Sequence, residues 1–162
     1  MTKGKTITTY LIDGNPNGIR TCFISNKICK AVVVPRAKLM DAKKRSELHQ
    51  PALYILISDS DDEIYIGETE DFLSRIRDHE AKKSFWDQAI IFVSKDNDLT
   101  KSDVKYLEYL AIKQAQETAR YNIDENKTSR SQQIYLNINS PLLKSFLRMC
   151  ARWQHFQGCL YL

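Results

Sequence analysis

A glutamate lies inside the apolar stripe of a predicted helix, where a carboxylate needs a partner. The helix is expected from Thr100 to about Thr118, because Thr100 and Asp103 have the spacing of a capping box. At 100° per residue, its apolar positions form one stripe that includes the position of Glu108. The apolar members of this stripe are Val104, Leu107, Ala111, Ile112 and Ala115. A carboxylate facing a core is costly unless it is paired or coordinates a cation. Glu108 is therefore a candidate metal ligand, half of an ion pair, or a residue at a stripe edge that reaches solvent.

A second predicted helix, over residues 70–82, carries an arginine and a histidine four residues apart. Thr69 is its expected N-cap, and its buried face is expected to consist of Phe72, Leu73 and Ile76. Arg75 and His79 would then lie side by side along the edge of that face. A guanidinium and an imidazole can clamp a phosphate and exchange a proton near neutral pH. The alternative is that Arg75 pairs with an acidic neighbour and His79 caps the helix end.

Two tyrosines lie on a predicted β-hairpin that precedes this helix. Residues 52–58 and 63–67 are apolar strands on either side of an acidic turn, and they carry Tyr54 and Tyr65. Gly67 ends the second strand, where it would allow close approach of backbone or ligand. A tyrosine in a strand usually only packs, so neither residue indicates a site by itself.

The composition sets limits on the partner and on the metal. A net charge of +4 and a pI near 8.8 permit a polyanionic partner, and equally describe a solvated basic surface. The four cysteines and three histidines lack C-x2-C and H-x3-H spacing, which argues against zinc. No stretch approaches the roughly 20 apolar residues that span a bilayer. We therefore expect a cytoplasmic protein with reduced thiols and no membrane partner.

The elements predict an α+β fold with an N-terminal extension. With a further strand over 88–94, the core order is strand, strand, helix, strand, helix, which predicts a small three-stranded, mostly antiparallel sheet flanked by helices. Before it come three expected strands, over 6–12, 19–25 and 30–34, and a basic helix over 35–48. The predicted division is an extension at 1–50, a core at 51–127 and an unassigned tail at 128–162, with one helix expected near 140–152.

Together these features resemble the GIY-YIG nuclease family. The family has two signature triplets, and similar triplets lie here at Ala52-Leu53-Tyr54 and, after ten intervening residues, at Tyr65-Ile66-Gly67. The first triplet begins Ala-Leu rather than Gly-Ile. Arg75 and His79 then fall at the arginine and histidine of the run that follows, and Glu108 at the metal-binding glutamate. A family asparagine is expected shortly after, at Asn126 or alternatively Asn122. The lead-in, from Asp13 to Arg20 and again at Pro35-Arg36, looks like the extension of a bacterial branch.

The resemblance implies a metal-dependent endonuclease that acts on DNA. Tyr54 or Tyr65 would accept a proton from water, with help from His79, while Arg75 stabilises the phosphorane. Glu108 would hold one Mg2+ or Mn2+, and Asn126 would support the geometry. Candidate substrate contacts are Gly67, Thr69, Arg36, Lys43 and Lys44. The alternatives are a non-catalytic nucleic-acid-binding module with the same fold, or a protein-interaction domain; the oligomeric state, monomer or dimer, stays open.

Overall fold

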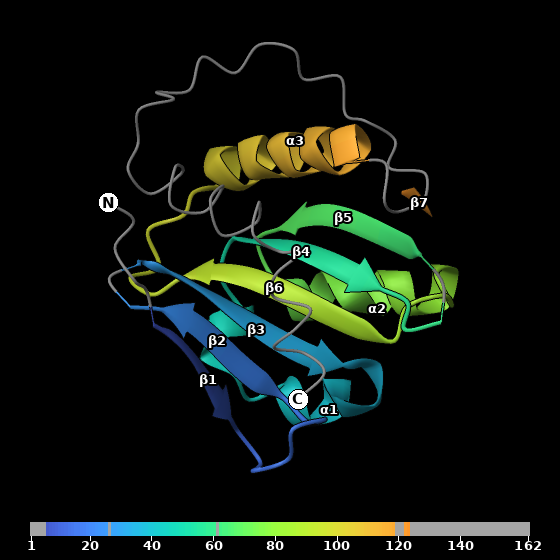
Figure 1. Cartoon of the computed structure of the whole chain (residues 1–162). Helices are drawn as coiled ribbons and strands as arrows, with labels where there is room; N and C mark the ends of the chain where they lie inside the picture. Colours follow the sequence, from blue (N-terminus) through green and yellow to red (C-terminus); the bar gives the residue numbers. More distant parts are fainter. Residues whose placement is uncertain (1–5, 26, 61, 119–121, 124–162) are drawn as a thin grey trace.

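One sheet runs through the residues that the computed structural model describes, which are 6–25, 27–60, 62–118 and 122–123 (Figure 1). The strand order is β1-β2-β3-β6-β4-β5-β7. All neighbours are antiparallel except β5 and β7, which are parallel. The strands are β1 (Ile7–Leu11), β2 (Arg20–Ile24), β3 (Cys29–Pro35), β4 (Ala52–Ile57), β5 (Glu63–Thr69), β6 (Gln88–Ser94) and β7 (Asn122–Ile123).

The predicted α+β class is correct, but the expected three-stranded sheet is too small. The core strands β4, β5 and β6 pair as expected, and the extension then continues the same sheet because β3 pairs with β6 along seven residues. Both strands are almost wholly apolar and buried, so each needs a neighbour along its edge as well as cover on both faces. The strands of the extension supply that neighbour.

Helices cover both faces of the sheet (Figure 1). The long helix α3 (Lys101–Thr118) packs on one face, and α2 (Phe72–Lys82) lies on the other with the short helix α1 (Leu39–Ala42). Side chains alternate between the two layers along each strand, so Leu53 and Ile55 face α3 while Tyr54 and Leu56 face α2. Among the described helices, none combines the length and the apolar character that a bilayer span requires.

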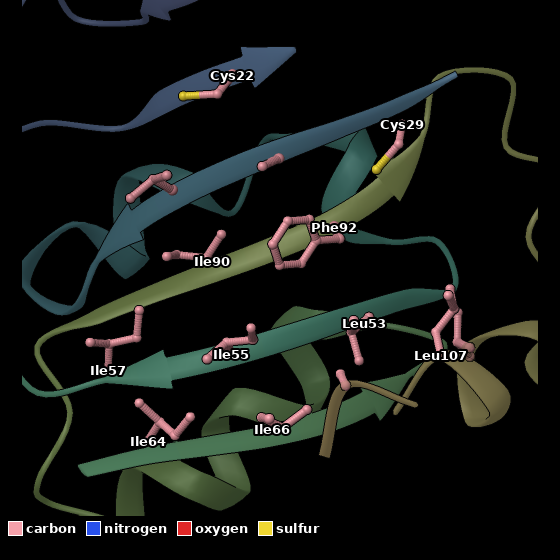
Figure 2. Packing of buried hydrophobic residues seen from close by; sticks show 14 of the residues in the cluster. Cys22, Cys29, Leu53, Ile55, Ile57, Ile64, Ile66, Ile90, Phe92 and Leu107 are labelled. Carbon is pink, nitrogen blue, oxygen red and sulfur yellow. The ribbon is translucent and has the colours of Figure 1, made fainter. Parts of the chain in front are cut away.

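The layer beneath α3 is a continuous apolar cluster (Figure 2). Phe92 of β6 lies next to Leu53 of β4, Ile66 follows on β5 at the other side of β4, and Leu107 of α3 belongs to the same cluster; all are at most 1% exposed. The predicted stripe of α3 is thus confirmed at its apolar positions. This cluster fixes α3 over β4 and β5, which determines where Glu108 can reach.

The predicted basic helix over 35–48 is wrong as a single element. The structure divides it into η1 (Arg36–Lys38), α1 and η2 (Ser46–Leu48), with Arg45 in an extended conformation between α1 and η2. In one unbroken helix Leu48 would point about 180° away from Leu39, nine residues earlier. The break at Arg45 lets both leucines be buried in the same cluster.

The start of α2 also differs from the expectation, whereas the start of α3 agrees with it. Thr69 does not cap the helix, because β5 continues through Thr69, which pairs with Ala52. Asp71 is the N-cap instead, and its carboxylate accepts a hydrogen bond from the Ser74 amide at 3.0 Å. At α3 the expected capping box is present: the amides of Thr100 and Asp103 each donate to the side chain of the other residue.

Candidate active site

Two phenols and an imidazole form an aromatic cluster between the sheet and α2. Tyr54 of β4 and Tyr65 of β5 have ring centroids 6.0 Å apart, and the His79 ring of α2 lies 4.9 Å from Tyr65. The Tyr54 hydroxyl and His79 Nε2 are hydrogen-bonded at 2.7 Å. Phe72, also on α2, packs edge-on against Tyr54 with centroids 5.5 Å apart. The sequence predicted these three polar side chains as a group, and the structure brings them together.

Gly67 provides the space that this cluster needs. It pairs directly with Tyr54 across the two strands. A Cβ at Gly67 would lie 2.5 Å from the Tyr54 hydroxyl oxygen and 2.8 Å from a Tyr65 ring carbon. The glycine therefore positions both phenols by leaving room for them, and its predicted role as a substrate contact is not needed to explain it.

Burial determines the protonation of Tyr54 and His79. Tyr54 is fully buried, and desolvation raises its pKa far above the usual value, despite the opposing charge of Arg75. Burial, with the charges of Arg75 and Lys83, lowers the pKa of His79 to about 4. At neutral pH the pair is thus a phenol and a neutral imidazole. In the tautomer with its proton on Nδ1, the imidazole accepts from the Tyr54 hydroxyl through Nε2.

Arg75 lies on the solvent side of this cluster. Its side chain is exposed, and a hydrogen bond to Tyr54 together with an interaction with Tyr65 raises its pKa. The guanidinium is thus held in place chiefly by the Tyr54 hydroxyl. An exposed, oriented guanidinium of this kind is suited to bind an oxyanion.

Glu108 approaches the same place from the opposite layer. It lies on α3, half-buried, and its carboxylate accepts a hydrogen bond from the backbone amide of Glu68 in β5. On the outer side of β5, β7 pairs with Glu63 and Ile64 only, which leaves the Glu68 end of the strand accessible to α3 among the described residues. Burial raises the pKa of Glu108, and the positive charge of Arg75 acts against this increase without reversing it.

A pair of carboxylates is the best candidate cation site near this edge. Burial and the neighbouring Glu68 carboxylate raise the pKa of Glu108 to about 7. Among the described residues, no group of three or more His, Cys, Asp or Glu side chains could enclose a metal. Two carboxylate oxygen donors with water fit a hard cation such as Mg2+, which normally keeps several waters. The described cysteines, Cys22 and Cys29, are buried thiols elsewhere in the sheet.

The remaining predicted contacts lie apart from this cluster or outside the described residues. The Arg36 guanidinium packs over the Trp86 ring at 4.9 Å and donates to the Ser84 carbonyl at 2.9 Å. Lys43 and Lys44 are exposed at the end of α1. Asn126 and the tail at 128–162 lie outside the described residues. Asn122 is placed by its backbone only, opposite Glu63 at the other end of β5 from Glu68.

Thr69 has a structural role in the loop that leads to α2. It is buried, its hydroxyl donates to the Asp71 carbonyl at 2.8 Å, and it accepts from the Asp71 amide at 3.0 Å. It thereby fixes the loop between β5 and the helix that carries Arg75. This agrees with a positioning role and gives no sign of direct contact with a substrate.

Two residues near the site were not singled out from the sequence. Glu68 follows Ile64 and Ile66 at intervals of two, so strand alternation alone places it on the α3 face with Glu108. Lys83 follows Arg75 and His79 at intervals of four, and its Nζ lies 4.4 Å from the centre of the Tyr65 ring. The two-residue spacing of the strand and the four-residue spacing of the helix could have identified both residues from the sequence, although neither residue belongs to the family motif.

Comparison with known proteins agrees with this geometry. No curated protein and no solved structure shows a significant match to the chain. A family model described as the GIY-YIG catalytic domain matches residues 50–122, which is less than half of the chain. The matched segment contains the hairpin, α2, β6 and α3, and therefore every described residue of the aromatic cluster, together with Arg75 and Glu108. Residues 50–122 are therefore similar to the catalytic domain of the GIY-YIG nucleases.

Proposed function

We propose that the chain is a metal-dependent endonuclease that hydrolyses phosphodiester bonds in DNA. The family implies nuclease activity and a nucleic-acid substrate; the DNA, the metal and the residue roles are the proposal. The observation that carries it is the exposed Arg75 guanidinium, which is hydrogen-bonded to the Tyr54 hydroxyl and whose charge also acts on the half-buried Glu108 carboxylate. A phosphate bound by this guanidinium would lie between the phenols and the carboxylate.

Tyr65 is the better candidate to accept the proton of the attacking water. Tyr54 is fully buried, its hydroxyl is bonded to His79, and its raised pKa makes it a poor base. Tyr65 is only partly buried and lies beside the imidazole, with the Arg75 guanidinium as a neighbour. We therefore assign proton transfer to Tyr65 and the positioning of His79 to Tyr54. Tyr65 would first release its own phenol proton to solvent, so that its phenolate oxygen can take the proton of the attacking water.

Arg75 would bind the phosphate, and the carboxylates of Glu108 and Glu68 would bind the cation. Arg75 would bind the non-bridging oxygens of the phosphate and stabilise the added negative charge of the transition state. Glu108, with Glu68 beside it, would hold a divalent cation on the opposite side of the phosphate. Such an ion, when bound, supplies charge neutralisation for the leaving 3′ oxygen. His79, uncharged at neutral pH, keeps the cluster able to accept a proton.

The test is cleavage of supercoiled and branched DNA with Mg2+ or with EDTA. We expect Mg2+-dependent nicking that Arg75→Ala and Glu108→Gln each reduce by at least about a hundredfold. Arg77→Ala and Glu117→Gln are matched controls, because these exposed residues lie on the same two helices and should leave nicking unchanged.

Two comparisons make the test decisive. Tyr65→Phe should lower kcat more than Tyr54→Phe, since only Tyr65 is assigned to proton transfer. Nicking that survives both Arg75→Ala and Glu108→Gln would refute the site. DNA binding without any cleavage by the unmodified protein would instead support the non-catalytic binding module.

A further inference from the structure

Lys83 is held in a defined position at the end of α2. Its backbone amide donates to the His79 carbonyl at 2.7 Å, and its own backbone is extended, so it ends the helix. Its ammonium lies over the face of Tyr65, 4.4 Å from the ring centroid. A cation is attracted to a ring face at this distance, so the phenol orients the lysine side chain.

Lys83 extends the basic edge of α2 away from Arg75. Arg75, His79 and Lys83 follow one another at intervals of four, which places them along one side of the helix. With a rise of about 1.5 Å per residue, Arg75 and Lys83 are separated by about 12 Å along the axis. Phosphates on one strand of a duplex advance by roughly 3.4 Å along its axis, so this distance spans three to four of them.

The electrostatics agree with a positively charged strip between these two residues. Arg75 and Lys83 both act to lower the pKa of His79, which places both charges close to the same imidazole. Among the described residues with the largest influence on the pKa of His79, the Asp78 carboxylate opposes these two charges and Lys82 adds to them. The imidazole between the two cations is uncharged at neutral pH, so the strip has a net positive charge.

We propose that Lys83 forms a second phosphate subsite, which binds a backbone phosphate of the nucleic acid about three to four nucleotides from the one held by Arg75. This proposal rests on the proposed function, because it takes Arg75 as the contact of the scissile phosphate. Tyr65 lies between the two subsites, in contact with His79 and Lys83. A strand bound at both points would be fixed in direction across the phenol that accepts the proton.

The experiment measures the salt dependence of binding and the kinetics of cleavage. Binding of a fluorescent DNA duplex is measured in the Glu108→Gln background, so that no cleavage occurs. Lys83→Met should weaken binding by roughly 5- to 10-fold at about 0.1 M salt and should reduce the slope of log K against log salt by about 0.9. In the otherwise unmodified protein it should raise KM by a similar factor and change kcat by less than about threefold.

Two further variants separate charge from structure. Lys95→Met is the matched control, because Lys95 also lies over an aromatic ring, 4.7 Å from the centroid of Phe23 in β2, away from the active site. It should leave the salt slope unchanged. Lys83→Arg should restore the slope, since it keeps the charge.

The outcomes are distinguishable. The subsite is wrong, and the nuclease assignment stands, if the unmodified protein cuts DNA and Lys83→Met has the same KM and the same salt slope of DNA binding. A fall in kcat alone would also overturn the subsite, because the lysine would then act on Tyr65 rather than on a phosphate. An unmodified protein that neither binds nor cuts DNA would overturn both proposals.

Discussion

Acidification should change the contributions of the two described histidines, His79 and His49, to the free energy of unfolding in opposite directions. His79 is buried against Tyr54, and burial lowers its pKa to about 4. His49 is exposed, and its Nδ1 lies 2.8 Å from the Asp71 carboxylate while its Nε2 approaches the Lys43 carbonyl. Both of these partners only accept hydrogen bonds, so they favour the doubly protonated ring, and the Asp71 contact raises the pKa of His49.

The effect of His79 on stability follows from the protons that each state binds. An unfolded chain has a histidine pKa of about 6.5, so between this value and about 4 the unfolded state binds more protons than the fold. The contribution of the neutral ring is therefore complete above about pH 6.5 and is lost as the pH falls through this window. The difference in pKa corresponds to roughly 3 kcal/mol in the free energy of unfolding, of which about 2 kcal/mol is lost by pH 5.

His49 has the opposite sign. Its folded pKa lies above the unfolded one, so its contribution is complete below about pH 6.5 and is lost as the pH rises through the folded pKa. Solvent screens this exposed pair, and the contribution of His49 should be the smaller of the two.

Urea denaturation at about pH 7.5 and about pH 5 tests both effects. Between these values, His79→Gln should lose about 2 kcal/mol less stability than the unmodified protein, because its pH-dependent group is gone. His49→Gln should be closest to the unmodified protein at the higher pH and should fall behind it at the lower. If His79→Gln loses as much stability on acidification as the unmodified protein, the neutral buried imidazole is wrong.

Three substitutions test other parts of the fold. Gly67→Ala should lower the free energy of unfolding, measured by urea denaturation, by about 1–3 kcal/mol and kcat by at least about a hundredfold, because the new methyl group would lie 2.5 Å from the Tyr54 hydroxyl. Gly14→Ala is the control, since Gly14 has φ 70° and nothing within 4 Å of a Cβ. It should lower the free energy of unfolding by about 1 kcal/mol and leave activity unchanged. Arg36→Gln should lower the free energy of unfolding by about 1–2 kcal/mol without changing the salt slope of DNA binding; a smaller slope would make Arg36 a phosphate contact after all. Leu107→Ala should cost about 2–5 kcal/mol in the same denaturation assay, and a loss below about 1 kcal/mol would contradict its place in the core.

Local patterns predicted the elements of the core well. Nearly continuous apolar runs at 52–58 and 88–94 identified β4 and β6, and the capping box at Thr100 located the start of α3. The site was predictable for the same reason, since Arg75 and His79 need only a helical period to become neighbours. The position of Glu108 beside Glu68 of β5 depends on how α3 packs on the sheet, which no local pattern contains.

The errors arose where distant segments determine the local structure. The pairing of β3 with β6 joins residues about sixty positions apart, and the apolar run of β3 shows only that it needs some neighbour. The helix expected over 35–48 was interrupted because burial of Leu48 outweighed the helical preference of the residues around it. Likewise, Thr69 belongs to β5 because it pairs with Ala52, so the N-cap of α2 is Asp71 rather than Thr69.

The pairing of β3 with β6 also decides how the protein can be divided. A fragment that begins near residue 50 would contain every matched residue of the family domain but would leave one side of β6 bare from Gln88 to Ser94. A flat, apolar strand with unsatisfied amides and carbonyls recruits other chains to complete its hydrogen bonds. The excised segment 50–122 would therefore aggregate. In the whole chain β3 pairs with β6 and so prevents this edge-to-edge association.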